Sequence, residues 1–198
     1  MLLPQCQEGI EAGTDEAGRG CLAGPVTAAA VILPQGYNLP QLNDSKKIGV
    51  QLRQELRKRI ESDALSYAVV HVPPEEIDSI NILNASILAM HRALEQLNTA
   101  PECIAVDGNR FKPYGNLPHQ CVIKGDGKYQ NIAAASILAK TYRDEYMLQL
   151  HEAFPHYGWK KNKGYPTKEH RLALQQHGAC RHHRKSFQLL PKQLVLSL

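Results

Sequence analysis

Two adjacent acidic residues near the start of the chain, Asp15 and Glu16, could bind a cation or take part in acid–base chemistry. They follow a short apolar segment, residues 9–13, and precede the turn Gly18-Arg19-Gly20. Two residues without side chains leave the backbone N–H groups of this turn open to a ligand. Taken alone, such a pair is more often a solvated acidic pair in a tight turn. Whether it belongs to a site depends on where other acidic residues lie.

Two further aspartates follow apolar segments in the second half of the chain. Asp107 comes directly after residues 103–106, and Asp126 comes shortly after residues 119–123. Each could be an ordinary turn former. If these segments are strands of one sheet, however, all the carboxylates come from strand ends, where the active groups of α/β sheets gather. Such carboxylates suit hard cations such as Mg²⁺ or Mn²⁺, and a pair of these ions can support the hydrolysis of a phosphodiester.

The hydrophobic pattern supplies the sheet that would position these residues. Apolar runs predict five strands, at residues 9–13, 25–33, 66–72, 103–106 and 119–123. Helical spacing of apolar residues predicts helices at 51–60, 75–80, 82–97, 129–151 and 168–176, with a basic, aromatic loop at 154–165. We therefore predict an α/β fold, a mixed five-stranded sheet flanked by helices, with a small C-terminal helical extension.

The composition is that of an ordinary globular chain. With 198 residues, of which 43% are hydrophobic and 21% charged, it can bury a core and shows no signature of disorder. We expect one domain over residues 1–198, with a catalytic core at about 9–155 and a basic loop and helical part at about 156–198. The five cysteines are scattered without a Cys-x-x-Cys pair, so neither a disulfide framework nor a zinc finger is expected. The longest apolar run is too short to span a bilayer, and we expect a cytoplasmic protein.

Charge is unevenly distributed along the chain. Residues 1–107 contain 8 basic and 14 acidic residues, whereas residues 108–198 contain 15 and 5. An acidic first half and a basic second half suit a metal site beside a surface that binds a polyanion. The asymmetry is common among proteins, so it supports the carboxylate argument without replacing it.

Seven short motifs stand in the order found in bacterial ribonuclease HII, the type 2 ribonuclease H, and together they resemble that family over residues 9–187. They are Asp15-Glu16-Ala17-Gly18-Arg19-Gly20, Asn43-Asp44-Ser45-Lys46, Asp107-Gly108-Asn109, Lys124-Gly125-Asp126, Ala134-Ala135-Ser136-Ile137-Leu138-Ala139-Lys140, Lys163-Gly164-Tyr165-Pro166-Thr167 and His183-Arg184-Lys185-Ser186-Phe187. The sister type, ribonuclease HIII, usually carries Gly-Thr-Gly at the first motif and has an extra N-terminal domain, for which we expect no room before Asp15.

The resemblance implies a ribonuclease H-like fold and an endonuclease that hydrolyses the RNA strand of RNA–DNA hybrids. It also implies incision on the 5′ side of ribonucleotides embedded in duplex DNA, which leaves 3′-hydroxyl and 5′-phosphate ends. Asp15, Glu16, Asp107 and Asp126 would hold two Mg²⁺ or Mn²⁺ ions, one positioning the attacking water and the other stabilising the departing 3′-oxygen. The implied partners are RNA–DNA hybrid and ribonucleotide-containing duplex DNA. We expect a monomer, without a membrane contact, and the sequence indicates no protein partner.

Recognition of the ribose can also be assigned to particular residues. Only the 2′-OH separates a ribonucleotide from a deoxyribonucleotide. The backbone of Gly18, Arg19 and Gly20 can approach it closely, and the resemblance implies that Tyr165 contacts the same hydroxyl and stacks on the adjacent sugar. Asn162 departs from the family, in which many relatives have His, and this departure concerns the substrate contacts around Tyr165.

Basic residues in three of the motifs are candidate phosphate contacts. Lys46, Lys163 and Arg184 would each bind the substrate backbone and make affinity depend on salt, although a single basic residue is more often a solvated surface charge. Lys140 and Asp144 lie four residues apart on a predicted helix and could pair with each other or with the site; of the two, we favour a structural ion pair.

Two other functions compete with a ribonuclease. A related nuclease or resolvase that cuts DNA could use the same carboxylates, but it needs no sensor of a 2′-OH, so Gly18-Arg19-Gly20 and Tyr165 argue against it. A catalytically silent nucleic-acid-binding domain would gain nothing from four acids that repel phosphate. The chain's ending, residues 188–198, lacks the aromatic pair of a replication-clamp peptide.

Overall fold

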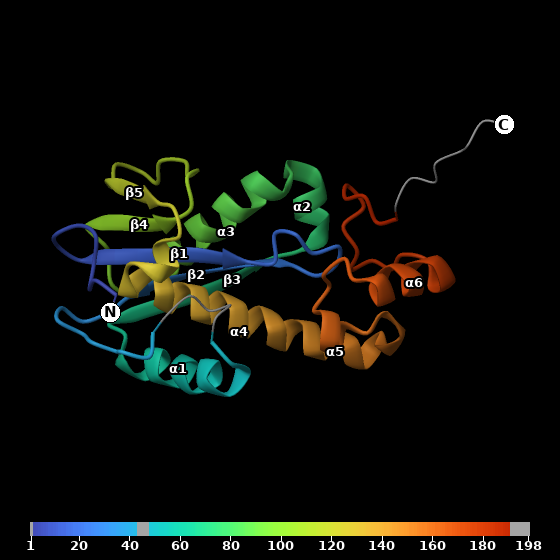
Figure 1. Cartoon of the computed structure of the whole chain (residues 1–198). Helices are drawn as coiled ribbons and strands as arrows, with labels where there is room; N and C mark the ends of the chain where they lie inside the picture. The colour runs from blue at the N-terminus through green and yellow to red at the C-terminus, as the bar shows by residue number, and fades with distance from the viewer. Residues whose placement is uncertain (1, 43–47, 191–198) are drawn as a thin grey trace.

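Five strands form one mixed sheet in the computed structural model, which describes residues 2–42 and 48–190. The strands stand in the order β3-β2-β1-β4-β5 and comprise β1 (Glu11–Ala17), β2 (Val26–Ile32), β3 (Ser66–Val72), β4 (Cys103–Asp107) and β5 (His119–Val122). β2 is antiparallel to both β1 and β3, whereas β4 runs parallel to β1 and β5 parallel to β4. The predicted mixed five-stranded sheet is therefore confirmed, and its central strand carries Asp15 and Glu16 (Figure 1).

Helices cover both faces of this sheet. They are α1 (Val50–Asp63), α2 (Pro74–Ile80), α3 (Ile82–Glu95), α4 (Gln130–Ala153), α5 (Trp159–Asn162) and α6 (Lys168–His177), with single 3-10 turns at η1 (Gly125–Gly127) and η2 (Pro155–Tyr157). Figure 1 shows α2 and α3 on one face and α1 and α4 on the other. The predicted helices are all present, with ends displaced by a few residues.

β2 is buried from end to end because it lies between the two helical layers. Its alternate residues face opposite sides, as the period of a strand requires. Ala28 and Ala30 join the core cluster of α3, and Ala29 and Val31 join the cluster that contains the first half of α4. The small side chains of β2 bring both layers close to the sheet.

The approach of α4 to β1 depends on one glycine. A Cβ atom on Gly13 would lie 2.2 Å from the backbone carbon of Asn131, at the start of α4. Only a residue without a side chain allows the helix to come this near. The small residues Ala133, Ala134 and Ala135 continue the contact and are completely buried. The first half of α4 is thus pressed against the strand that carries the acidic pair.

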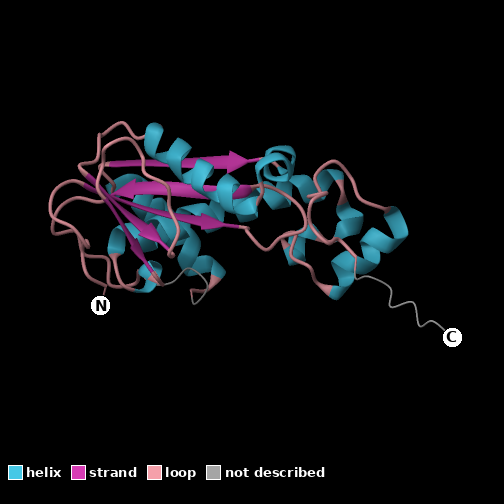
Figure 2. Cartoon of the chain, turned by 90° about the horizontal axis from the view of Figure 1, so that it is seen from above, coloured by secondary structure: helices cyan, strands magenta, loops and turns pink. Residues whose placement is uncertain are grey.

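Two sequence predictions are corrected. The first strand continues through Ala17 rather than ending at residue 13, because Thr14 and Asp15 extend the ladder with Ala30 and Ala29 of β2. Residues 154–165 are not a loop throughout: they contain η2 and α5. Trp159 is completely buried there, in a cluster with residues of α4 and α6 that extends the molecule beyond the end of the sheet (Figure 2).

Candidate active site

A pocket of about 280 Å³ opens where β1 and β4 end. Parallel pairing sets Thr14 opposite Val106, so the next residues, Asp15 and Asp107, lie near each other toward the same edge of the sheet. The pocket is lined by residues of β1, the loop after it, β4, α4 and the segment after α5, namely Asp15, Glu16, Ala17, Gly18, Arg19, Gly20, Asp107, Ser136, Lys140 and Tyr165. The structure therefore brings together three of the four predicted carboxylates, the predicted glycine loop and Tyr165.

Asp15 is the most deeply placed of the pocket carboxylates, with 6% of its surface exposed. Its Oδ1 accepts a hydrogen bond of 2.6 Å from the amide N–H of Glu16. Burial raises the pKa of the Asp15 carboxyl well above its usual range, and the charges of Glu16 and Asp107 raise it further, while a hydrogen bond from Ser136 acts in the opposite direction. A bound cation would favour the ionised form of this group.

Glu16 points to the other side of β1, where the pocket continues toward α3 as a second hollow of about 150 Å³. Its Oε1 accepts a hydrogen bond of 3.2 Å from Nη1 of Arg19. Burial raises the pKa of Glu16 to about 7; the charge of Arg19 opposes this shift, and that of Asp107 adds to it. The pocket and the hollow share Glu16, Arg19 and Asp107, so they adjoin each other at these residues.

Asp107 ends β4 and is held by the turn that follows β5. Its Oδ1 accepts a hydrogen bond of 2.7 Å from the amide N–H of Gly125. Asp126 is the next residue, is buried within η1, and does not line the pocket. Its assignment as a metal ligand stays a prediction.

The loop after β1 presents its backbone to the pocket. Arg19 and Gly20 are exposed, whereas Gly18 is buried and has a φ of +95°, a conformation that favours glycine. Within the described part of the chain, the amide N–H groups of Arg19 and Gly20 have no acceptor. Two adjacent, exposed donors without partners are suited to bind an oxygen atom of a ligand.

Tyr165 also lines the pocket, and 39% of its surface is exposed. The ring centroid is 6.0 Å from Nζ of Lys140 and 5.9 Å from Cζ of Arg143. The backbone of Tyr165 is fixed on both sides, since its N–H donates to the carbonyl of Asn162 and its carbonyl accepts from Nδ1 of His170, both at 2.9 Å. Burial raises the pKa of the hydroxyl above its ordinary value, so this group stays protonated and can donate.

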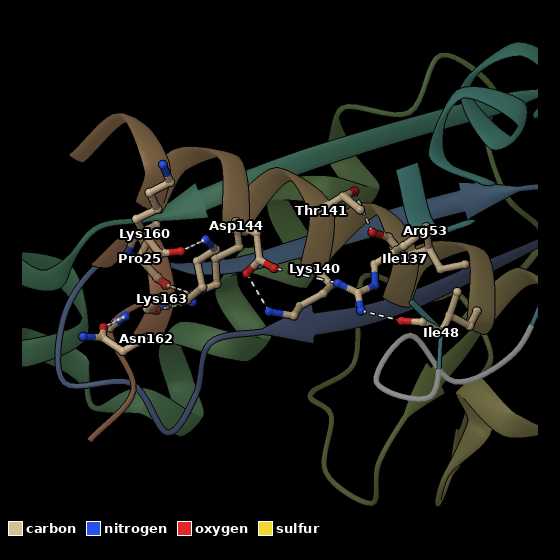
Figure 3. A network of polar contacts seen from close by, with 12 residues as sticks. Pro25, Ile48, Arg53, Ile137, Lys140, Thr141, Asp144, Lys160, Asn162 and Lys163 are labelled. Atoms are coloured by element: carbon tan, nitrogen blue, oxygen red, sulfur yellow. Dashed lines mark hydrogen bonds and ion pairs between the residues drawn. The ribbon is translucent and has the colours of Figure 1, made fainter. Parts of the chain in front are cut away.

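The three residues predicted to contact phosphate differ in their positions. Lys46 lies outside the described residues. Lys163 is half-buried, and its ammonium donates to the carbonyl of Lys160 (Figure 3). Arg184 is completely buried and donates to the carbonyls of Gly24, at 3.1 Å, and Arg19, at 2.9 Å. The prediction that Arg184 contacts a phosphate is therefore wrong, because its guanidinium is buried and hydrogen-bonded to carbonyls of the loop after β1.

Asn162, the departure from the family pattern, is a structural residue. It is buried, its Nδ2 donates to the carbonyl of Tyr157 at 2.7 Å, and its Oδ1 accepts from the amide N–H of Gly164 at 2.8 Å. Both groups of the side chain are thereby used to shape the turn that leads to Tyr165.

Lys140 and Ser136 also line the pocket, although neither was among the predicted site residues. Nζ of Lys140 donates to Oδ1 of Asp144 at 2.5 Å, which confirms the predicted pair, and Nη1 of Arg53 lies 3.8 Å from the other oxygen of Asp144 (Figure 3). Residues 136 and 140 are four apart, so they share one face of α4. That spacing, on a helix with a face of small residues, could have predicted that Ser136 and Lys140 lie together in the pocket.

The donor set of the pocket fits a hard cation. Within residues 2–42 and 48–190, no three His, Cys, Asp or Glu side chains are already gathered into a complete metal-binding group. The carboxylates of Asp15, Glu16 and Asp107 nevertheless supply only oxygen donors, as Mg²⁺ and Mn²⁺ prefer. Burial and mutual repulsion raise the pKa of Asp15 and Glu16, and a divalent cation would counteract both effects.

Over the part of the chain that the structure describes, no helix combines the length and the apolar character needed to cross a bilayer.

The chain is similar to known proteins along most of its length. The family model described as ribonuclease HII matches residues 12–190. Ribonuclease HII of Christiangramia forsetii is 66% identical over 185 residues, which cover 93% of each chain. The crystal structure of the ribonuclease H2 from Pyrococcus horikoshii OT3 matches with a TM-score of 0.75 and 26% identity, over 90% of this chain and 94% of that chain.

A more distant structure shares the fold. The crystal structure of Bst-RNase HIII in complex with Mn²⁺ matches with a TM-score of 0.71 and 20% identity, over 91% of this chain and 67% of that chain. The sheet order and the acidic pocket are thus accompanied by a sequence match along nearly the whole chain. The chain belongs to the ribonuclease HII family, the ribonuclease H enzymes that hydrolyse the RNA strand of RNA–DNA hybrids.

Proposed function

We propose that this protein incises duplex DNA on the 5′ side of embedded ribonucleotides, in addition to acting on RNA–DNA hybrids, and leaves 3′-hydroxyl and 5′-phosphate ends. One observation carries the proposal: a single pocket contains three carboxylates, two exposed N–H donors and the Tyr165 ring. The acids are suited to phosphodiester hydrolysis, and the donors and the ring are suited to reading a sugar. Reading and cutting would then occur at one nucleotide.

The carboxylates would work with divalent cations. Asp15, Glu16, Asp107 and Asp126 would hold two Mg²⁺ or Mn²⁺ ions, which supply activation of the attacking water and stabilisation of the departing 3′-oxygen. The crystal structure of Bst-RNase HIII in complex with Mn²⁺ supports this for the shared fold. The buried position of Asp15 and the raised pKa of Glu16, about 7, make the ionised forms dependent on a cation.

The 2′-OH would be read from two sides. The hydroxyl can accept a hydrogen bond from the exposed N–H of Gly20 and donate one to a neighbouring oxygen. The protonated hydroxyl of Tyr165 supplies a second donor, and its ring a surface for the sugar. A deoxyribonucleotide would leave these donors without a partner in the closed complex, which costs binding energy.

Lys140 would contribute positive charge to the same pocket. Its ammonium is anchored by Asp144 and lies near the ring of Tyr165. A fixed cation at this position can bind a phosphate oxygen of the substrate. The pocket thus contains acids for cations, a cation for phosphate and neutral donors for the sugar.

The test is a duplex of DNA that carries one ribonucleotide, compared with the same duplex made entirely of DNA. We expect a single cut 5′ of the ribonucleotide with Mg²⁺ or Mn²⁺, and none with EDTA. Equal cutting of both duplexes would instead identify a DNA nuclease and refute the proposal, as would activity that survives EDTA. Asp107→Asn should abolish cutting while binding persists; unchanged turnover would remove Asp107 from the site.

A further inference from the structure

Two arginines lie completely buried beneath the loop of residues 18–25. Arg143, from α4, and Arg184, from the segment after α6, both have 0% of their surface exposed. Among the described residues, neither forms an ion pair with a carboxylate. Burying a guanidinium without a counter-charge is costly unless its N–H groups find acceptors. Here the acceptors are backbone carbonyls of the segments that form the pocket.

Arg143 joins two segments that are far apart in the sequence. Its Nε donates to the carbonyl of Pro25 at 3.0 Å, and its Nη2 to that of Ala23 at 3.1 Å. Its Nη1 donates to the carbonyl of Lys163 at 2.9 Å, two residues before Tyr165. One side chain therefore holds the loop after β1 against the segment that carries the aromatic ring.

Arg184 controls the direction of one peptide group. Its Nη1 donates to the carbonyl of Arg19 at 2.9 Å, and this carbonyl belongs to the same peptide as the N–H of Gly20. The chain has no cis peptide bond in its described part, and in a trans peptide the C=O and the N–H point in opposite directions. Because Arg184 draws the carbonyl into the core, the N–H of Gly20 points away from the core.

The two segments also touch directly, with no room for adjustment. The amide N–H of Leu22 donates to the carbonyl of Gly164 at 2.8 Å. A Cβ atom on Gly164 would lie 2.5 Å from the carbonyl oxygen of Ala23. The backbone N–H of Arg184 donates to the carbonyl of Leu22 at 2.9 Å, so the third segment closes the assembly.

Burial of the Arg184 guanidinium destabilises the folded protein. Nη2 of Arg184 is buried and has no hydrogen-bond partner within the described part of the chain. Burial and the neighbouring charge of Arg143 together lower the pKa of Arg184 to about 10. Proteins keep such unfavourable groups mainly where they serve a function.

We propose that Arg143 and Arg184 are positioning residues for recognition of the ribose: they lock the 18–25 loop and the 163–165 segment into one rigid unit and aim the N–H of Gly20 at the 2′-OH. The inference rests on the proposed function, because it assigns the cause of the selectivity that this function requires. Neither arginine touches the substrate. Their effect is transmitted through the carbonyls of Arg19 and Lys163.

The experiment measures binding of two duplexes, one with a single ribonucleotide and one all-DNA, by Asp107→Asn protein so that nothing is cut. Arg184→Lys and Arg143→Lys are compared with Arg57→Lys, a control whose guanidinium pairs with Glu61 and Glu145 rather than with carbonyls of the loop. In Arg184→Lys and Arg143→Lys, the ratio of the affinities for the ribonucleotide duplex and the all-DNA duplex should fall about tenfold. This is the effect expected from the loss of one hydrogen bond. Binding of all-DNA duplex should change less than about twofold in all three.

Hydrogen exchange supplies a readout that does not depend on binding. The amide of Leu22 should exchange faster in both loop variants and at the unchanged rate in Arg57→Lys, because only the former loosen its contact with Gly164. A parent protein with no ribonucleotide preference would overturn the proposed function. A normal preference in the parent that survives both substitutions, or that falls equally in the control, would overturn this inference alone. Should the Lys variants not fold, Arg184→Gln and Arg143→Gln, which keep a single NH₂ group as donor, serve the same comparison with the same outcomes.

Discussion

Arg143 lies directly behind Gly18: a Cβ atom on this glycine would come within 1.9 Å of Nε of Arg143. At Gly20, two residues later in the same turn, no atom lies within 4 Å of the equivalent position. The two positions of this motif therefore require glycine for different physical reasons. Gly18 lacks a side chain because a guanidinium occupies the space, and Gly20 leaves open space in front of the pocket.

Substitution of the two glycines should separate these roles. Gly18→Ala should lower the free energy of unfolding by roughly 2 kcal/mol or more, since it combines a steric overlap with a φ of +95°. Gly20→Ala should leave the thermal midpoint nearly unchanged but reduce cleavage at a single ribonucleotide about tenfold, because the new methyl group keeps the sugar from the N–H. Thermal unfolding and cleavage rates of both variants check this. Equal loss of stability in the two would contradict it.

Glu16→Gln should stabilise the metal-free protein at alkaline pH. The pKa of Glu16 is about 7 in the folded protein and 4.5 ordinarily, so the folded state binds the proton more tightly. The stability that this provides is fully present below pH 4.5 and is lost as the pH rises through 7. Glutamine remains neutral and avoids this loss, so the variant should gain roughly 2 kcal/mol over the parent above pH 7.

The measurement is urea unfolding of both proteins between pH 5 and 8.5, without divalent cations. The exposed Glu152→Gln is the matched control and should follow the parent at every pH. Added Mg²⁺ or Mn²⁺ should stabilise the parent and not Glu16→Gln, because the variant has lost a ligand. A difference between variant and parent that does not grow with pH would show that burial of the Glu16 charge is not costly.

Tyr165→Ala should weaken discrimination between ribonucleotide-containing and all-DNA duplexes more than it weakens duplex binding in general. Tyr165 lines the pocket, whereas general affinity for a duplex comes from basic residues that contact the phosphates of the duplex. We expect the ratio of cleavage rates between ribonucleotide-containing and all-DNA duplexes to fall at least about tenfold, with duplex affinity within about threefold. Tyr165→Phe keeps the ring and should retain stacking while losing the hydroxyl contact. Equal losses of affinity for both duplexes would assign Tyr165 a general role.

His183 should make the C-terminal part sensitive to acid. Its Nδ1 accepts a hydrogen bond from the amide N–H of Cys180 at 3.1 Å, which leaves the ring proton on Nε2, 3.1 Å from Nε2 of His170. Burial lowers the pKa of His183 to about 4 from 6.5, and the charge of His170 contributes. The unfolded chain therefore takes up the proton first, and the stability that the neutral ring provides is lost as the pH falls from 6.5 toward 4.

Comparison of the parent with His183→Asn isolates this group from the carboxylates that titrate in the same range. The parent should be the more stable protein at pH 7, and its advantage should shrink by roughly 2 kcal/mol by pH 4. Urea unfolding at several pH values measures the advantage, and the ring signals of His183 in NMR spectra give its pKa directly. An advantage that is constant from pH 7 to 4 would contradict the assignment.

The sequence by itself determined the sheet and the identity of the acids. Five apolar segments, bounded by Gly, Pro and polar residues, have the period and length of strands, and parallel strands must end at a common edge. Asp15 and Asp107 were therefore expected to meet, and they do. The family resemblance rested on short motifs whose order along the chain is independent of their positions in space.

Only the tertiary structure decided which basic residues face the substrate and which support the fold. A sequence pattern gives the spacing of residues but not the burial of a single long side chain, so Arg184 was expected at the surface and lies in the core. The same limit applies to α5, which forms because Trp159 finds a place between α4 and α6, elements that are separate in the sequence. Packing of distant segments, rather than local preference, fixed the direction of the Gly20 N–H and the place of Lys140 in the pocket.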